Sequence, residues 1–144
     1  MYNPFFLYGK TILVTGASLG ATLVLTGRNE EALLETKEQL QGDGHIHLIA
    51  DLSDEKSCEE LVKQLPVLDG CVSNAGQGKM LPVQFYSMEV LEDIFKINSF
   101  APMLLLKHLV KKKKLKNPSS VVFTASISGY NNVAPANGIY GASK

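Results

Sequence analysis

Two residues near the end of the chain have types and spacing suited to proton transfer. Tyr140 and Lys144 are four positions apart, so on a helix they share one face. A nearby ammonium group favours the phenolate form of a tyrosine, which makes its hydroxyl usable as a general acid or base. The pair therefore predicts acid–base chemistry, provided that one helix carries both side chains.

The elements that would position this pair follow from hydrophobic periodicity. Apolar runs predict strands at residues 12–16, 21–26, 45–50, 68–73 and 120–125. Helical spacing predicts helices from an N-cap at Asn29 to about residue 40, over 53–65, and from an N-cap at Ser87 through 98, with a bend at Pro102. Gly42 and Gly44 should end the first of these helices. Strands separated by single helices predict a parallel sheet with helices on both faces, which is a doubly wound, three-layer α/β fold.

Ligands of such sheets bind beyond the carboxyl ends of the strands. The residues expected at that edge are Gly16, Arg28, Asp51, Leu52, Asn74, Ala75, Gly76 and Ser126. Each alone has an ordinary structural explanation as a turn, a helix entry or a left-handed bend. Their placement at one edge of the sheet favours a binding site.

Composition limits the class of protein. The chain has 144 residues, of which 45% are hydrophobic and 19% charged, and this predicts one globular domain over residues 1–144. Its formal net charge of zero gives no argument for nucleic acid or an anionic membrane. We interpret the basic run Lys111 to Lys114 as the solvated last turn of a helix. No apolar run is long enough to cross a bilayer, and the first residues lack a basic signal-peptide region, so we expect a soluble cytoplasmic protein.

Metal binding is not expected. Cys58 and Cys71 have a spacing that fits neither a metal knuckle nor a disulfide framework. His45, His47 and His108 have no carboxylate or cysteine at ligand spacing. We expect ordinary thiols and packing or rim histidines.

The stretch from Ile12 to Arg28, ILVTGASLGATLVLTGR, raises a question of topology. A buried strand running into a glycine turn at Gly16 is how a dinucleotide-binding βαβ unit begins. Only four residues, Ala17 to Gly20, precede the next apolar run. A crossover between parallel strands usually takes about a dozen residues or more, so the crossover helix is missing from this sequence.

The ordered series Thr15-Gly16-Ala17-Ser18, Asp51-Leu52, Asn74-Ala75-Gly76, Asn98, Ser126 and Tyr140-Gly141-Ala142-Ser143-Lys144 resembles the motifs of the short-chain dehydrogenase/reductase family. The resemblance extends from about Gly9 to the last residue. It implies a Rossmann-type sheet, a nicotinamide cofactor, and hydride transfer between an alcohol and a carbonyl. It also places 3-oxoacyl thioesters high among candidate substrates and implies a homo-oligomer, a dimer or a tetramer. Its cofactor-binding positions in this chain are Gly16, Ser18, Asp51, Leu52, Asn74, Ala75, Gly76, Tyr140 and Lys144.

Four residues would carry the implied catalysis. Hydride arriving at a ketone carbon puts negative charge on the oxygen, which the Ser126 hydroxyl could stabilise while Tyr140 delivers the proton. Ser128 is a chemical alternative, although the family spacing favours Ser126. The resemblance assigns Asn98 to a water-mediated proton relay that reaches Lys144. By residue type alone, a polar residue among apolar helix positions is more often a satisfied core amide.

The end of the second predicted strand bears on cofactor choice. Units that bind NAD usually place an acidic residue there for the ribose 2′-hydroxyl, whereas an arginine can accept the 2′-phosphate of NADP. This chain has Arg28, which favours NADP(H) over NAD(H), although a surface arginine needs no ligand to explain it. Arg28 also follows Gly16 more closely than the usual spacing of about 20 residues, as a missing helix would require.

Two explanations account for the short connection. We favour a chain that is a subset of a longer protein, with a segment omitted between Ser18 and Leu19 and more residues after Lys144. This predicts a large Cα separation between Ser18 and Leu19, with parallel, adjacent first strands. A true deletion predicts an antiparallel hairpin and an inactive Rossmann remnant that acts as a binding or interaction module. We favour an active NADP-dependent carbonyl reductase instead, because all four catalytic positions of the family pattern are present: Asn98, Ser126, Tyr140 and Lys144.

Overall fold

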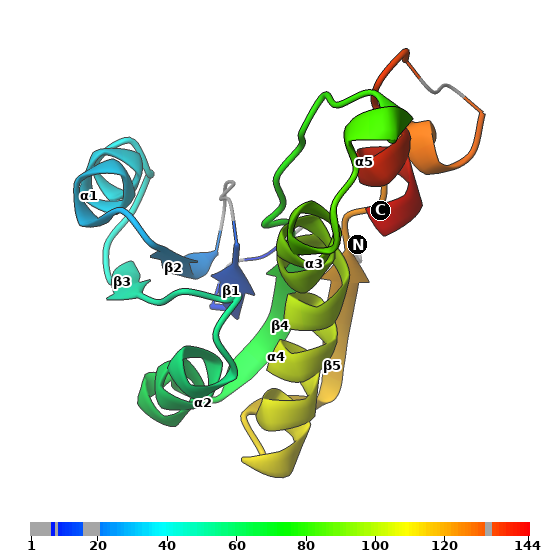
Figure 1. Ribbon diagram of the computed structural model, residues 1–144. Helices are drawn as coiled ribbons and strands as arrows, with labels where there is room; N and C mark the ends of the chain where they lie inside the picture. The colour runs from blue at the N-terminus through cyan, green and yellow to red at the C-terminus, as the bar shows by residue number, and fades with distance from the viewer. Residues whose placement is uncertain (1–6, 8, 16–20, 132–133) are drawn as a thin grey trace.

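Five parallel strands form the centre of the molecule. The computed structural model describes residues 7, 9–15, 21–131 and 134–144. The sheet order is β3-β2-β1-β4-β5, and each neighbouring pair is parallel (Figure 1). The predicted doubly wound, Rossmann-type sheet is confirmed. The strands are β1 (Thr11–Val14), β2 (Thr22–Gly27), β3 (Ile46–Ile49), β4 (Leu68–Ser73) and β5 (Leu115–Phe123).

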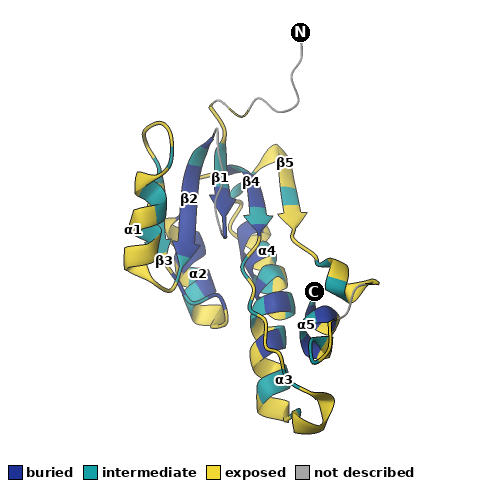
Figure 2. Cartoon of the chain, turned by 90° about the horizontal axis from the view of Figure 1, so that it is seen from above, coloured by how far each residue is buried: buried dark blue, intermediate teal, exposed yellow. Residues whose placement is uncertain are grey.

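Helices lie on both sides of this sheet. In Figures 1 and 2, α1 covers one face at β2 and β3, whereas α2 and α4 cover the other. The helices are α1 (Glu30–Glu38), α2 (Glu55–Gln64), α3 (Met88–Phe95), α4 (Ala101–Lys111) and α5 (Gly138–Ser143). Two 3₁₀ turns, η1 (Val83–Phe85) and η3 (Ile127–Gly129), lie in the loops after β4 and β5.

Side-chain alternation along the strands builds two apolar layers. Leu13 and Val24 face α2 and α4, where they join the larger core cluster. Val14, Leu23 and Leu25 face the α1 side and form a smaller cluster. The nearly continuous apolar runs of β1 and β2 therefore come from strands that are buried on both faces.

Local sequence signals place most element boundaries. The side chains of Asn29 and Ser87 accept bonds from the backbone N–H groups of Ala32 at 3.1 Å and Val90 at 3.3 Å, so both predicted N-caps are confirmed. Gly42 and Gly44 have positive φ angles just after α1. Two predictions were less accurate. Helix α2 begins at Glu55, two residues after the predicted start at residue 53, and β5 spans Leu115–Phe123 rather than 120–125.

The helix that contains Asn98 accommodates Pro102 through a local change of winding. Residues Lys96–Phe100 form a π-helical segment, η2, in which the Ala101 N–H bonds the Lys96 carbonyl. Pro102 has no N–H to offer the carbonyl of Asn98, and its ring crowds that carbonyl, so a wider turn relieves the clash. Asn98 thus lies at a π-bulge between α3 and α4, a place where functional residues are frequent.

The first two strands are parallel and adjacent, with Thr11 opposite Thr22 and Val14 opposite Leu25. This part of the sequence prediction is confirmed, and the antiparallel hairpin is wrong. The expected Cα separation between Ser18 and Leu19 lies outside the described residues. A strand as short as β1 needs a return of only about 13 Å. Residues 15–21 are long enough to span that distance, so parallel pairing by itself does not require a crossover helix.

The basic run at the end of α4 contacts the neighbouring helix instead of being fully solvated. Lys112 pairs with Glu59 of α2 at 3.2 Å. Lys114 donates from Nζ to the carbonyl of Lys63 at 3.2 Å and to that of Leu65. Because the last carbonyls of a helix have no intrahelical partner, a cation there stabilises the end of α2.

Asp69 connects three strands at the amino-terminal edge of the sheet. Its carboxylate accepts a bond from the Thr11 N–H at 2.9 Å and pairs with Lys116 of β5 at 2.8 Å and with Lys10 at 3.4 Å. The hydrogen bond from Lys116, followed by that from the Thr11 N–H, lowers the pKa of Asp69 to about 2.

This arrangement makes stability depend on pH in a defined window. A carboxyl whose folded pKa is depressed stabilises the fold above its unfolded pKa, about 3.9, and loses that contribution as pH falls through about 2. Asp69→Asn should therefore reduce the free energy of unfolding at pH 7 and show a smaller loss between pH 4 and pH 2. Urea unfolding of both proteins across this range measures the difference. Parallel pH curves would show that Asp69 does not contribute this dependence.

Candidate active site

The two residues predicted for proton transfer share a pocket beyond the carboxyl ends of β4 and β5. Tyr140 and Lys144 are on α5 and at its C-cap, and the Lys144 N–H bonds the Tyr140 carbonyl at 3.1 Å. Both line a cavity of about 340 Å³. Its other lining residues are Asn74, Gly76, Gln77, Gly78, Thr124, Ala125 and Asn137. The geometry expected from the four-residue spacing is confirmed.

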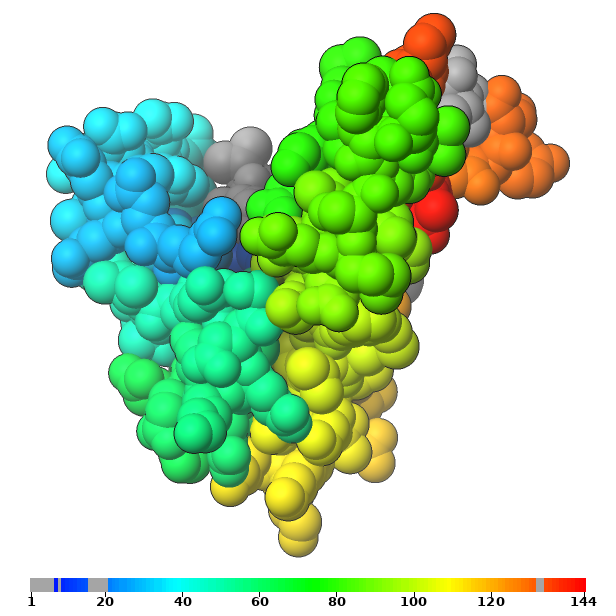
Figure 3. All heavy atoms as spheres, in the orientation of Figure 1, coloured from blue at the N-terminus to red at the C-terminus, as the bar shows by residue number. Residues whose placement is uncertain are grey.

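A second hollow continues from this pocket toward β2. It has a volume of about 280 Å³ and shares Asn74, Gly76 and Gln77 with the first. Its far end is formed by Gly27 and Arg28. In Figure 3 the molecule is hollowed between the blue atoms of β2 and α1 and the green atoms that follow β4. The two hollows form one groove along the edge of the sheet that sequence analysis singled out.

Thr15 fixes the backbone of the groove floor. Its buried hydroxyl accepts bonds from the N–H groups of Asn74 and Ala75, the latter at 2.7 Å, and donates to the Val72 carbonyl at 3.3 Å. Thr26 on the neighbouring strand lines the same groove, but its buried hydroxyl has no hydrogen-bond partner among the residues that the structure describes. The two threonines are therefore alike in burial and opposite in hydrogen bonding.

Thr15→Val and Thr26→Val should accordingly differ in stability. Thr15→Val leaves two backbone N–H groups without acceptors, which should cost about 2–4 kcal/mol of the free energy of unfolding. Thr26→Val replaces an unpaired hydroxyl by a methyl group of similar shape, so the change should be neutral or stabilising. Thr15→Ser, which keeps the hydroxyl, should retain most of the stability. Equal effects of the two valine substitutions in urea unfolding would contradict this assignment.

Asn98 joins the loop after β4 to α5. Its Oδ1 accepts from the Gln77 N–H at 2.8 Å, and its Nδ2 donates to the Gln77 carbonyl at 2.9 Å and to Ser143 Oγ at 2.8 Å. The interpretation from residue type alone, that Asn98 is a core amide whose polar atoms are hydrogen-bonded, therefore agrees with the structure. Its role in a proton relay stays a prediction.

Gly76 allows Lys144 to approach this amide. A Cβ at position 76 would lie 3.1 Å from Asn98 Oδ1 and 3.3 Å from Lys144 Nζ. Either neighbour would have to shift to make room for a side chain. The absence of a side chain at Gly76 therefore keeps the Lys144 ammonium next to the amide and the pocket.

The segment that carries Ser126 packs against α5 without placing its side chain in the pocket. A Cβ at Gly129 would lie 2.8 Å from the Gly141 carbonyl oxygen, so η3 and α5 touch through their backbones. Ser126 Oγ accepts a bond from the Ser128 N–H at 3.2 Å, whereas the pocket is lined by Thr124 and Ala125 of the same segment. Ser126 thus lies in a segment that packs against α5, and its catalytic role stays a prediction.

The predicted cofactor residues at the ends of β2 and β3 are brought together. Asp51 Oδ1 accepts bonds from Ser53 N at 2.9 Å and Ser53 Oγ at 2.6 Å. The bonds from Ser53 chiefly, and the charge of Arg28 in addition, lower the pKa of Asp51. Leu52 is buried and lines the groove with Arg28. Gly16 and Ser18 lie outside the described residues.

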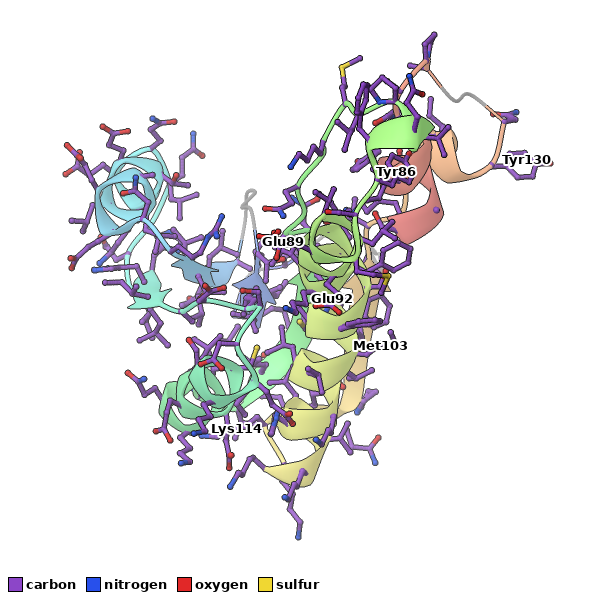
Figure 4. The ribbon with its side chains drawn as sticks, in the orientation of Figure 1. Tyr86, Glu89, Glu92, Met103, Lys114 and Tyr130 are labelled. Carbon is purple, nitrogen blue, oxygen red and sulfur yellow. The ribbon has the colours of Figure 1, made fainter. Side chains whose placement is uncertain are left out.

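Sequence reasoning did not select several residues of this site, and three of them are informative. Thr15 and Asn137 were not selected, although one anchors the groove floor and the other lines the pocket. Tyr86 was also missed. Its hydroxyl accepts a bond from the Ile139 N–H at 2.8 Å, and Figure 4 shows it beside α5. No periodic pattern marks these residues, because their partners are remote in sequence.

The described residues contain no cluster of three or more metal-ligating side chains. Burial raises the pKa of the Cys58 and Cys71 thiols to about 11, which makes both poor ligands and poor nucleophiles. Within the same part of the chain, no helix is long and apolar enough to cross a membrane.

Comparison with known proteins agrees with this geometry. The family model described as short chain dehydrogenase matches residues 8–144. The chain therefore belongs to the short-chain dehydrogenase family, and the resemblance inferred from its motifs is confirmed.

The alignments with individual relatives cover most of this chain but only part of each relative. The chain is 32% identical to the uncharacterized oxidoreductase YciK of Escherichia coli K12 over 94% of this chain and 58% of YciK. It is 30% identical to the 3-oxoacyl-[acyl-carrier-protein] reductase FabG of Rickettsia felis over 96% of this chain and 62% of that protein. A solved short chain dehydrogenase of Escherichia coli CFT073, complexed with NADPH, matches with a TM-score of 0.75 and 30% identity over 96% of this chain and 67% of that chain. This chain thus spans roughly three fifths of the curated relatives.

The relatives also carry residues inside the matched region that this chain lacks. The alignment with YciK extends over 146 positions, although it uses only 94% of the 144 residues present here. The alignment therefore contains gaps in this chain, where YciK has residues that this chain does not have.

Proposed function

We propose that this chain is the nucleotide-binding and catalytic part of an NADP(H)-dependent oxidoreductase that interconverts a ketone and a secondary alcohol. The observation that carries the proposal is the pocket shared by Tyr140, Lys144 and the Asn74–Gly76 segment. That pocket continues into the groove that ends at Arg28. A groove with an acid–base pair at one end and a cation at the other suits a phosphorylated dinucleotide.

The residues present fit that cofactor. Asn74, Ala75 and Gly76 form a backbone floor held by Thr15, and Asp51 and Leu52 follow β3 at the same edge. Arg28 supplies a positive charge where a 2′-phosphate would lie. The complex of the Escherichia coli CFT073 relative with NADPH supports this choice. When bound, NADPH supplies the hydride.

The chain's own groups handle the proton. Tyr140 donates its hydroxyl proton to the oxygen of the reduced carbonyl and takes it back in the reverse direction. Lys144 stabilises the resulting phenolate, and Gly76 leaves room for its ammonium group. Ser126, at the end of the neighbouring strand, is the residue that we assign to donate a hydrogen bond to the developing oxyanion.

Finer assignments of substrate, location and assembly belong to this proposal. The identity to the Rickettsia felis reductase supports 3-oxoacyl thioesters as substrates. The family resemblance supports a homo-oligomer, and we place the protein in the cytoplasm. The partial coverage of its curated relatives supports a longer parent chain, in which residues 1–144 belong to a single NADP-binding oxidoreductase domain.

Cofactor titration followed by turnover tests the proposal. NADPH fluorescence titration should give tighter binding than NADH. Loss of absorbance of NADPH should then follow addition of a 3-oxoacyl thioester. Binding of NADPH without turnover of any carbonyl compound would favour the inactive binding module, and the absence of binding would overturn the proposal.

A further inference from the structure

We propose that Tyr86 is a positioning residue for Tyr140. Its hydroxyl fixes the first turn of α5, and that turn sets where the Tyr140 side chain lies in the pocket. The inference rests on the proposed carbonyl reduction and goes beyond it, because Tyr86 is outside the set of described residues that line the pocket. Tyr86 therefore reaches the reaction only through the backbone of α5.

The helix that carries Tyr140 is too short to be rigid by itself. Helix α5 has six residues, and two of them, Gly138 and Gly141, are glycines. Isolated helices of fewer than about 12 residues are marginal in water, and glycine weakens a helix further. The side chain of Asn137, at the N-cap, makes no capping bond. The place of Tyr140 therefore depends on contacts with other segments.

The Tyr86 hydroxyl supplies the bond that the N-cap side chain does not make. It accepts the Ile139 N–H at 2.8 Å, one residue before Tyr140. The first N–H groups of a helix have no partner within it, and Ile139 is only 1% exposed, so water is a poor substitute. A Cβ at Gly138 would lie 3.1 Å from the Tyr86 hydroxyl oxygen, so a glycine there permits this close approach.

Tyr86 is itself held between two elements. Its N–H bonds the Val83 carbonyl at 3.1 Å at the end of η1, and the next residue, Ser87, caps α3. The same segment is joined to the approach to α5 by a bond from the Leu81 N–H to the Ala136 carbonyl at 2.8 Å. The Tyr86 hydroxyl is thus a fixed point for the start of α5, beside which Figure 4 shows it.

Separate bonds hold the other end of α5. Ser143 Oγ accepts from Asn98 Nδ2 at 2.8 Å, and the Ser143 carbonyl accepts from Ser99 Oγ at 2.8 Å. Tyr140 lies between these bonds and the one from Tyr86. Loss of the Tyr86 hydroxyl should therefore release the first turn while the end of α5 stays attached. A misplacement of about 1 Å at a reacting group can lower a rate by about a hundredfold.

Tyr86→Phe removes the acceptor and keeps the aromatic ring. It should lower kcat per NADPH-binding site by about tenfold and change the NADPH dissociation constant and the substrate KM by less than about twofold. A merely structural role would reduce the number of NADPH-binding sites without lowering kcat per site. Tyr130→Phe makes the same chemical change at an exposed position and should alter none of these values.

A double-mutant comparison tests whether Tyr86 acts through Tyr140. When Tyr140→Phe is already present, adding Tyr86→Phe should lower the residual turnover by less than about twofold, because the group that Tyr86 positions has lost its proton. A further tenfold loss in that background would show that Tyr86 affects the reaction by another route and would overturn the proposal.

Amide hydrogen exchange tests the anchor without turnover. The Ile139 amide should exchange at least about tenfold faster in Tyr86→Phe than in the wild-type chain, because its acceptor is gone. Unchanged exchange of Ile139, or an unchanged kcat per site, would overturn the role of Tyr86 in an active enzyme. A wild-type chain that reduces no carbonyl compound would overturn the proposed function and this role together, and faster exchange would then report a structural contact only.

Discussion

Tyr140→Phe should lower the turnover of a carbonyl substrate by about a hundredfold or more, the usual scale of general acid catalysis. The change removes one hydroxyl from the pocket and leaves the aromatic ring in place beside Gly78, where an added Cβ would lie 3.7 Å from Tyr140 Cδ2. Packing and NADPH binding should therefore be nearly unaffected. Steady-state reduction and an NADPH titration measure the two quantities separately.

A matched control is available in Tyr130→Phe. Tyr130 is 88% exposed and points away from α5 in Figure 4. Its substitution should leave both turnover and NADPH affinity unchanged. Near-normal carbonyl reduction by Tyr140→Phe would remove Tyr140 from the proton-transfer role.

Arg28→Asp should weaken NADPH binding by about a hundredfold while NADH affinity holds or improves. Arg28 lies at the edge of an open hollow that α1 lines with carboxylates. These are Glu30, Glu31, Glu35 and Glu38. Their charges repel a 2′-phosphate, so Arg28 is the group that makes a phosphate favourable there.

Two further variants test whether the effect is specific. Arg28→Gln removes the cation without adding repulsion and should give an intermediate loss of NADPH affinity. Lys56→Asp reverses a charge on the exposed surface of α2, across the sheet from α1, and should not change the ratio of NADPH to NADH affinity. Equal losses for both cofactors in Arg28→Asp would mean that Arg28 supports the fold instead of binding the phosphate.

Local chemistry in the sequence was enough to place the elements and the edge of the site. Several element boundaries depend only on neighbours a few residues away. These are the limits of β4, the N-caps at Asn29 and Ser87, and the glycines that follow α1. The edge at which the strands end was equally readable, because in a parallel sheet the loop after every strand begins at the same edge. The spacing of Tyr140 and Lys144 placed both in one pocket, since one helical turn separates them.

The tertiary structure alone decided how these parts are held together. Thr15 reaches Asn74 and Ala75, and Asn98 reaches Gln77 and Ser143, only because sheet order and helix packing bring remote segments into contact. The π-bulge at Asn98 and the extra length of β5 likewise depend on backbone geometry and on pairing with β4. Periodicity reports which face of an element is apolar, but a hydrogen bond between distant residues leaves no periodic trace. The sequence by itself therefore determined the fold class and the chemistry at the sheet edge, and the folded chain decided which side chains share the pocket.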